Sequence, residues 1–200
     1  MATSGPGATN LLTGIADAYM DSIPMVIITG QVAANFIGKN AFQETDIIGM
    51  TRPIVKHSYL VLDEKDIVST IVNAFYLANS GRPGPVLIDI PKNVQQKKLP
   101  FVFSDRPSLT AYELPPAPEK KEIRAAIAKS RRPCLYAGGG IIASDAAGEL
   151  TRFAELYQIP VATTLMGVGS IPEDHPLSLK WLGMHGTYYA NYAANECDLL

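Results

Sequence analysis

A run of three glycines is the stretch of this sequence whose spacing most directly suggests ligand chemistry. The segment GGGIIA at 138–143 follows a predicted strand and matches G-x-G-x-x-A, a loose form of the dinucleotide-binding fingerprint. Glycines there let backbone N–H groups and a helix end approach a phosphate. The NAD form also needs an acidic residue after the next strand, where this chain has TTLMG at 163–167. Two interpretations stay open: a nucleotide site, or a turn that needs glycine only for close packing.

Several isolated polar side chains near predicted turns have types that proteins use in binding or catalysis. Gln43 follows the aromatic Phe42 in a loop, and Lys92 follows the carboxyl end of a buried strand, where open α/β sheets place ligands. Arg82 lies in the rigid turn SGRPGP, and His185 has a ring that could act as a base. The same types are common in packed loops, on solvated surfaces and in structural hydrogen bonds. None of these residues identifies a site by itself.

The two cysteines give no sign of a metal or redox centre. Cys134 and Cys197 lack metal-ligand spacing, and the sequence contains no metal-ligand cluster, no serine or cysteine triad and no P-loop. We interpret both cysteines as reduced thiols in or near the core of a cytosolic-type chain.

The composition is that of a globular protein without an electrostatic signature. The 200 residues are 47% hydrophobic, and 17 Lys and Arg against 19 Asp and Glu give a formal net charge of -2. This balance argues against nucleic acid or an anionic membrane as partner. No basic region leads into an apolar run at the N-terminus, and no apolar stretch reaches about 20 residues. We expect a cytoplasmic protein, unless a longer parent carries a transit peptide, with small molecules or other chains as partners.

Helical and strand patterns alternate along the first part of the chain. Apolar residues from Leu11 to Tyr19 recur at helical spacing, with Thr9 or Asn10 as the N-cap. The pattern then predicts a strand at 24–30, a helix at 64–79 and a strand at 84–91. Such alternation predicts a doubly wound α/β fold, with a mostly parallel sheet covered by helices on both faces.

A second α/β unit follows a proline-rich segment. Five prolines interrupt the region between Gln95 and Lys121, which indicates a linker. Beyond it the pattern predicts helices at 123–128 and 146–157, strands at 133–137 and 160–165, and a further strand starting at Cys197. We therefore expect one domain at 1–95, a linker at 96–120 and a second domain at 121–200.

The first residues suggest that the chain is a segment of a longer protein. The turn SGPG at 4–7 is of a type that normally joins two elements, yet it stands at the start of the sequence. The alternative is a complete small α/β protein with ragged ends.

Taken in order, six stretches resemble one enzyme family over essentially all 200 residues. ATSGPGATNLLTGIADAYMDSIPMVIITGQV, AFQETD, SGRPGPVLIDIPK, LYAGGG, TTLMGVGS and LGMHGT are similar to the catalytic (large) subunits of acetolactate synthases. That family condenses two 2-oxoacids with the help of thiamine diphosphate, Mg²⁺ and FAD. The resemblance implies the later part of a pyrimidine-binding domain, a linker, and the early part of a central FAD-binding domain.

The resemblance also implies roles for individual residues. Pro6 and Asn10 would contact the thiamine pyrimidine, and Gln43 would lie at the active site beside Phe42. Arg82 matches an arginine that contacts FAD, and Lys92 matches a lysine near the substrate entrance. The residues that would line the flavin are Gly138, Gly139, Gly140, Thr164, Leu165, Met166, Leu182, Gly183, Met184 and His185.

Other parts of the family's machinery are expected outside these 200 residues. The glutamate that activates thiamine would precede Met1, the metal and diphosphate motif belongs to a third domain, and a segment completing the flavin pocket would follow Leu200. No metal ligand is therefore expected in this chain, and these residues alone are predicted to be inactive and weakly stable. Ala33 stands where some members carry a proline in the herbicide channel.

For the parent protein we expect pyruvate and 2-oxobutyrate as substrates, in the synthesis of branched-chain amino acids. It would decarboxylate pyruvate and join the two-carbon unit to a second 2-oxoacid. A homo-oligomer, dimer or tetramer, is expected, with a possible small regulatory subunit. The alternatives are another thiamine-diphosphate and FAD enzyme, of the pyruvate oxidase or glyoxylate carboligase type, or a non-catalytic nucleotide-binding module.

Overall fold

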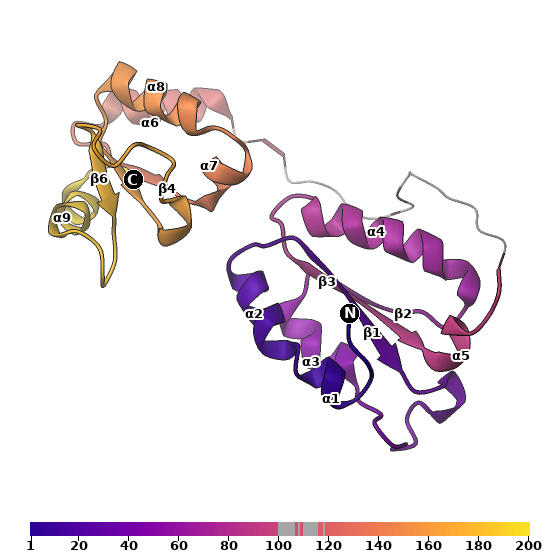
Figure 1. Ribbon diagram of the computed structural model, residues 1–200. Coiled ribbons are helices and arrows are strands. Elements are labelled where there is room, and N and C mark those ends of the chain that lie inside the picture. Colours follow the sequence, from indigo (N-terminus) through magenta and orange to yellow (C-terminus); the bar gives the residue numbers. More distant parts are fainter. Residues whose placement is uncertain (100–106, 108, 110–115, 118) are drawn as a thin grey trace. The chain divides into compact units, whose positions relative to one another are not determined.

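The computed structural model describes residues 1–99, 107, 109, 116, 117 and 119–200. The chain divides into two compact units, Met1–Pro116 and Ala117–Leu200, each of which is described by itself (Figure 1). Much of the predicted linker at 96–120 lies outside the described residues, so the three-part division made from the sequence stays a prediction.

The first unit is built on a parallel sheet with β3 (Pro85–Pro91) in the middle. β1 (Met25–Gln31) and β2 (His57–Leu60) flank it in the order β1-β3-β2, and both run parallel to it. Every residue of β3 is buried, as expected for a continuous apolar run covered on both faces. The sequence predicted β1 and β3, whereas it did not predict β2.

Helices cover both faces of this sheet (Figure 1). On one face α4 (Ile67–Asn79), which follows the 3₁₀ turn η3 (Glu64–Asp66), packs its alanines and Leu77 against Val86, Ile88 and Ile90. On the other face α2 (Leu12–Met20) and α3 (Ile47–Thr51) pack against Ile27 and Leu87. Alternate residues of β3 therefore serve two separate cores, which confirms the predicted doubly wound arrangement.

A short helix that the sequence did not predict follows a single parallel bridge between Ala2 and Thr29 of β1. α1 (Pro6–Thr9) begins at a proline, whose fixed φ suits the first helical position. Thr9 Oγ1 and Asn10 Nδ2 both bind the carbonyl of Pro6, at 3.2 and 2.8 Å. The prediction that one of them caps α2 is wrong, because both side chains serve the preceding turn; Leu11 occupies the N-cap position without a side-chain bond. Three more short elements complete the unit: η1 (Ala34–Phe36), η2 (Arg52–Ile54) and α5 (Lys92–Gln95).

The second unit repeats the plan with shorter strands. β4 (Leu135–Ala137), β5 (Val161–Thr163) and β6 (Ser178–Trp181) are parallel and lie in that order. α7 (Gly139–Ala143) and α8 (Ala147–Tyr157) supply the core on one face, and α9 (Tyr188–Glu196) covers the other. The remaining elements are α6 (Lys120–Lys129) and η4 (Leu165–Gly167). The sequence predicted α6, α8, β4 and β5, whereas it did not predict β6 and α9.

Both cysteines are free thiols on the α9 face of this sheet, as predicted. Cys134 is buried, and Cys197 is partly buried against the same cluster. Burial raises the pKa of the Cys134 thiol. Leu199 forms one parallel bridge with Pro133, and Cys134 donates its N–H to the Leu199 carbonyl at 2.9 Å. The predicted strand start after Cys197 is present as this single bridge. Within the described part of the chain, no helix combines the length and apolarity needed to cross a membrane.

Candidate functional site

A cavity of about 750 Å³ lies at the carboxyl ends of β1 and β3. Its lining includes Gln43 and Lys92, together with Gln31 from the end of β1 and Gln95 from α5. Two predicted catalytic residues from distant parts of the sequence are thus brought to one cavity, at the edge where parallel sheets bind ligands. Phe42, the third, is 89% exposed and does not line this cavity.

The opening glycine turn and the loop that carries Gln43 are in direct contact. Gly5 is buried and has a φ of 60°, and a Cβ added to it would lie 2.9 Å from Cβ of Gln43. Gln43 itself has a φ of 60°, a conformation that costs a non-glycine residue energy and often marks functional sites. Only glycine fits at position 5, for both its backbone angle and its contact.

The carboxylate of Glu44 fixes the shape of the loop that carries Gln43. It accepts the N–H of Ala41 at 2.8 Å and also the N–H of Gly38. These two hydrogen bonds are the main causes of a lowered pKa for Glu44. Asp46 ends the loop as the N-cap of α3, accepting the N–H of Gly49 at 2.9 Å. Both acids lie in the stretch AFQETD, and no individual role was predicted for them from the sequence.

A buried carboxylate lies on the same face of the sheet as this loop. Asp89 is 1% exposed; its Oδ1 accepts from Thr29 Oγ1 at 2.7 Å and its Oδ2 from Gln31 Nε2 at 3.0 Å. Burial raises the pKa of Asp89 to about 6, against the opposing effect of these two hydrogen bonds. Asp89 was not predicted as a site residue because it lies inside an apolar run. An aspartate within a fully buried strand was itself the available signal, since buried carboxylates need partners.

The two residues predicted to contact the thiamine ring lie beside this cavity's lining and not in it. Pro6 and Asn10 are exposed at the two ends of the α1 turn, and the side-chain amide of Asn10 donates to the Pro6 carbonyl. The lining itself comes from the segment just before, Met1 to Ser4. The ring contacts of Pro6 and Asn10 stay predictions.

Arg82 lies at the opposite end of β3 from Lys92. Its Nε donates to Ser22 Oγ at 2.7 Å and its Nη2 to the Met20 carbonyl at 3.2 Å. Met20 is the last residue of α2, so the guanidinium binds a helix C-terminus, where a positive charge is favourable. The seven residues of β3 separate Arg82 from the cavity by roughly 20 Å. The structure therefore does not bring Arg82 together with Gln43.

In the second unit the predicted flavin-lining residues follow the carboxyl ends of three neighbouring strands. One segment follows β4, one follows β5 and one follows β6, and the N–H of Leu182 donates to the Thr163 carbonyl at 3.1 Å. Leu165 and Met184 are 65% and 95% exposed, and His185 is exposed as well. The segments with their predicted residues are Gly138–Gly140, Thr164–Met166 and Leu182–His185.

The three glycines after β4 differ in the space around them. A Cβ on Gly139 would lie 3.1 Å from Cβ of Met166, whereas one on Gly138 would meet Thr164 only at 3.8 Å, and one on Gly140 would meet nothing within 4 Å. Close packing therefore explains Gly139 and leaves Gly138 and Gly140 with open approaches. Both line a cavity of about 430 Å³ with Tyr136 and Ile141.

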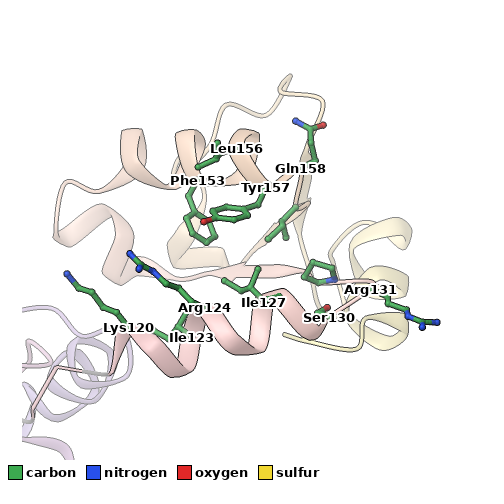
Figure 2. A pocket seen from close by; sticks show the side chains of 13 residues that line it. Lys120, Ile123, Arg124, Ile127, Ser130, Arg131, Phe153, Leu156, Tyr157 and Gln158 are labelled. Carbon is green, nitrogen blue, oxygen red and sulfur yellow. The ribbon is translucent and has the colours of Figure 1, made fainter.

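A larger cavity, of about 850 Å³, lies between α6 and α8. Ile123 and Ile127 of α6 face Phe153 and Tyr157 of α8 across it, and Lys120 extends at one end (Figure 2). None of the predicted site residues lines this cavity. Across the described residues, no three His, Cys, Asp or Glu side chains gather in a way that could hold a metal ion.

Two family profiles match the chain. The N-terminal TPP binding domain of thiamine pyrophosphate enzymes matches residues 1–50, and the central domain of thiamine pyrophosphate enzymes matches residues 121–200. The first match includes the Gly5 turn and Gln43, and the second includes all three flavin-lining segments.

The chain is also similar to curated proteins along its whole length. It is 57% identical to acetolactate synthase 1, chloroplastic, of Zea mays, an alignment that covers 100% of this chain and 32% of that protein. It is 55% identical to the acetolactate synthase large subunit of Parasynechococcus marenigrum (strain WH8102), over 99% of this chain and 33% of that protein. It is 54% identical to acetolactate synthase, chloroplastic, of Arabidopsis thaliana, over 100% of this chain and 30% of that protein. The chain thus spans about a third of the length of the curated relatives it matches.

Proposed function

Because the chain belongs to the acetolactate synthase family of thiamine pyrophosphate enzymes, we propose that the whole protein is a thiamine-diphosphate-dependent acetolactate synthase. It would convert two molecules of pyruvate into 2-acetolactate and CO₂, or pyruvate and 2-oxobutyrate into 2-aceto-2-hydroxybutyrate and CO₂. The observation that carries the proposal is an identity of 53–57% to acetolactate synthases through both units.

The cavity at the ends of β1 and β3 suits the thiamine part of this chemistry. Its volume of about 750 Å³ is that of a small-molecule site, and the buried Gly5 turn packs directly against Gln43, one of its lining residues. Thiamine diphosphate, when bound, supplies the means to break the bond between the carboxylate and the carbonyl carbon of pyruvate. Gln43 would offer an amide to the reacting groups, and Lys92 would attract the carboxylate of a 2-oxoacid.

The edge of the second sheet suits a flavin dinucleotide. Gly138 and Gly140 leave their backbone open to a phosphate, and the exposed side chains of Leu165 and Met184 offer apolar surface for a ring. FAD is therefore proposed as a resident cofactor without a net redox role. Arg82 would contact it with the guanidinium N–H groups that its bonds to Ser22 and Met20 do not use. Mg²⁺ is proposed for the whole protein, with no ligand assigned among the described residues.

Assembly and location follow the same family expectation. We propose a homo-oligomer, dimer or tetramer, to which a small regulatory subunit could add, working in the cytoplasm or, after a transit peptide, in a plastid. Sedimentation of the whole, active protein as a monomer at its working concentration would contradict the oligomer.

Product analysis of the whole protein tests the proposed activity. With pyruvate as sole substrate, and with thiamine diphosphate, Mg²⁺ and FAD supplied, we expect 2-acetolactate. Acetate as the main product would favour a pyruvate oxidase, and tartronate semialdehyde from glyoxylate would favour a glyoxylate carboligase. A protein that binds a nucleotide but joins no 2-oxoacids would be the non-catalytic module.

A further inference from the structure

The loop that carries Gln43 is tied to the sheet through a buried amide. Gln31, at the end of β1, is 7% exposed. Its Nε2 donates to the backbone carbonyl of Thr45 at 2.8 Å and to Asp89 Oδ2 at 3.0 Å, while its Oε1 accepts the N–H of Val32 at 2.9 Å. Both ends of the amide are thus engaged, so the side chain cannot turn without breaking buried hydrogen bonds.

Asp89 provides the fixed end of this connection. It is surrounded on both sides by strands, because Thr29 of β1 and Leu60 of β2 are its neighbours in the sheet. With its pKa near 6, its carboxyl group is ionised at neutral pH. Hydrogen bonds to a carboxylate are shorter and stronger than those between neutral groups. A charged anchor therefore holds Gln31, and Gln31 holds Thr45.

Thr45 connects the anchored Gln31 to the loop that carries Gln43. It lies two positions after Gln43, in a loop whose internal shape is set by Glu44. Those internal bonds fix the loop's shape but not its place on the sheet. Among the hydrogen bonds of the described residues, the bond from Gln31 to Thr45 is the one that ties residues 41–46 to the strands.

We propose that Gln31, anchored on Asp89, is a positioning residue that holds the loop of residues 41–46, and with it Gln43, at the cavity formed by β1 and β3. This inference rests on the proposed function, since the position of Gln43 matters to catalysis only if that cavity is the thiamine site.

Two variants of the whole protein separate positioning from simple stability. Gln31→Met keeps the length of the side chain, but it removes one donor from Asp89 and the only side-chain bond described to Thr45. Thr29→Val removes the other donor from Asp89, and the Thr29 hydroxyl is bonded to Asp89 and not to the loop. Both variants leave the carboxylate with one donor, so they are matched at Asp89, and Gln31→Met additionally leaves the Val32 N–H without its acceptor.

Hydrogen exchange without substrate or cofactor gives the first readout. The backbone N–H groups of Gly38 and Ala41 are protected by hydrogen bonds to the Glu44 carboxylate. The N–H of Glu44 is protected by its bond to the Ala41 carbonyl. In Gln31→Met we expect them to exchange about tenfold faster, the effect of losing one buried hydrogen bond, and in Thr29→Val we expect a change under about twofold. If Gln31→Met fails to fold, Asp89→Asn keeps the side-chain size and weakens the same anchor, and is expected to raise exchange about threefold.

Turnover gives the second readout. In Gln31→Met we expect kcat for acetolactate formation to fall about 10- to 100-fold, as small misplacements of a reacting group do, with a smaller change in the KM for pyruvate. Equal loop exchange in Gln31→Met and Thr29→Val, or an unchanged kcat in Gln31→Met, would overturn the positioning role. A wild-type protein that makes no acetolactate would overturn the proposed function instead, and the exchange result would still stand.

Discussion

At the scale of single residues, Asp89 gives the protein a pH-dependent stability. Its pKa in the folded protein is about 6, above the ordinary value of 3.8, so between these values the folded state binds more protons than the unfolded state. The free energy of unfolding therefore falls as pH rises from about 4 to about 6, by roughly 3 kcal/mol at most. Keeping the ionised carboxylate buried in the sheet costs free energy, so the protein is less stable at neutral pH than at about pH 4.

Asp89→Asn is the variant that isolates this effect. Urea unfolding of wild type and variant should be compared from pH 4 to pH 7.5. Relative to Asp89→Asn, the wild type is expected to lose stability steadily up to about pH 6 and to level off above it. A difference between the two proteins that does not change with pH would show that the carboxyl group titrates normally.

Gly5 is a second residue whose type is dictated by its surroundings. Gly5→Ala would place a Cβ 2.9 Å from the Cβ and carbonyl oxygen of Gln43, at a φ of 60°. We expect a loss of about 2 kcal/mol or more in unfolding free energy. Gly14→Ala is the matched control, because Gly14 is the third residue of α2 and a Cβ there meets nothing within 4 Å. It should stabilise by about 0.5 to 1 kcal/mol, and equal effects of both changes would contradict the prediction.

At the scale of elements, the turns after β4 and β5 depend on each other. A Cβ on Gly167, in η4, would lie 2.2 Å from the carbonyl oxygen of Ala137, at the end of β4. Gly167→Ala must push these two turns apart, so we expect a loss of about 2 kcal/mol or more in the free energy of unfolding. We also expect the whole protein to retain the proposed flavin more weakly. Gly148→Ala in α8, where a Cβ meets nothing within 4 Å, should leave flavin absorbance near the wild-type value and, like Gly14→Ala, should not lower the temperature of thermal unfolding. Flavin content that is the same in both variants would disconnect these turns from the cofactor.

Elements with strong local patterns could be predicted from the sequence. β1, β3 and β5 are apolar runs closed by turn residues, and α4 and α8 have apolar positions at helical spacing. β2 (HSYL) and β6 (SLKW) alternate with polar residues and become strands because a central partner offers them hydrogen bonds. The cap of α2 was mispredicted because Pro6 starts a helix earlier. Rules that use only the local sequence do not describe pairing with a distant strand or a cap position that changes because an earlier helix is present.

The candidate site was predictable to a similar degree. The glycine turn and Lys92 stood out because turn chemistry and strand ends leave marks in the sequence, whereas Gln43 was placed at the active site through the family resemblance, and these roles stay predictions. Gln31 and Asp89 were missed because their role depends on a register that pairs Thr29 with Asp89, 60 positions apart in the sequence. The positive φ of Gln43 has no signal in the sequence either.

At the scale of the whole molecule, residues 1–200 alone are expected to lack synthase activity. They match the N-terminal and central domain profiles of the family and span 30–33% of the relatives' length. A polypeptide of these residues should be assayed for acetolactate with saturating thiamine diphosphate, Mg²⁺ and FAD. We expect turnover at least about 10²-fold below that of the whole protein, since loss of a positioned acid or base alone costs that much. Turnover close to that of the whole protein would require the catalytic roles to be reassigned within this chain.

Because β3 lies between β1 and β2, the moment of its synthesis determines when this sheet can form on the ribosome. β1 and β2 do not pair with each other, and both wait for β3, whose last residue follows the end of β1 by 60 positions. At about 5 to 20 residues per second, β1 spends roughly 3 to 12 seconds outside the tunnel without β3, with the bridge to Ala2 as its other pairing. Protease protection of nascent chains should therefore appear in one step, after Pro91 emerges, and gradual protection from β1 onward would contradict this order. Until that moment the segment MVIITGQ is an apolar stretch of the nascent chain that lacks β3 and is open to binding by a chaperone.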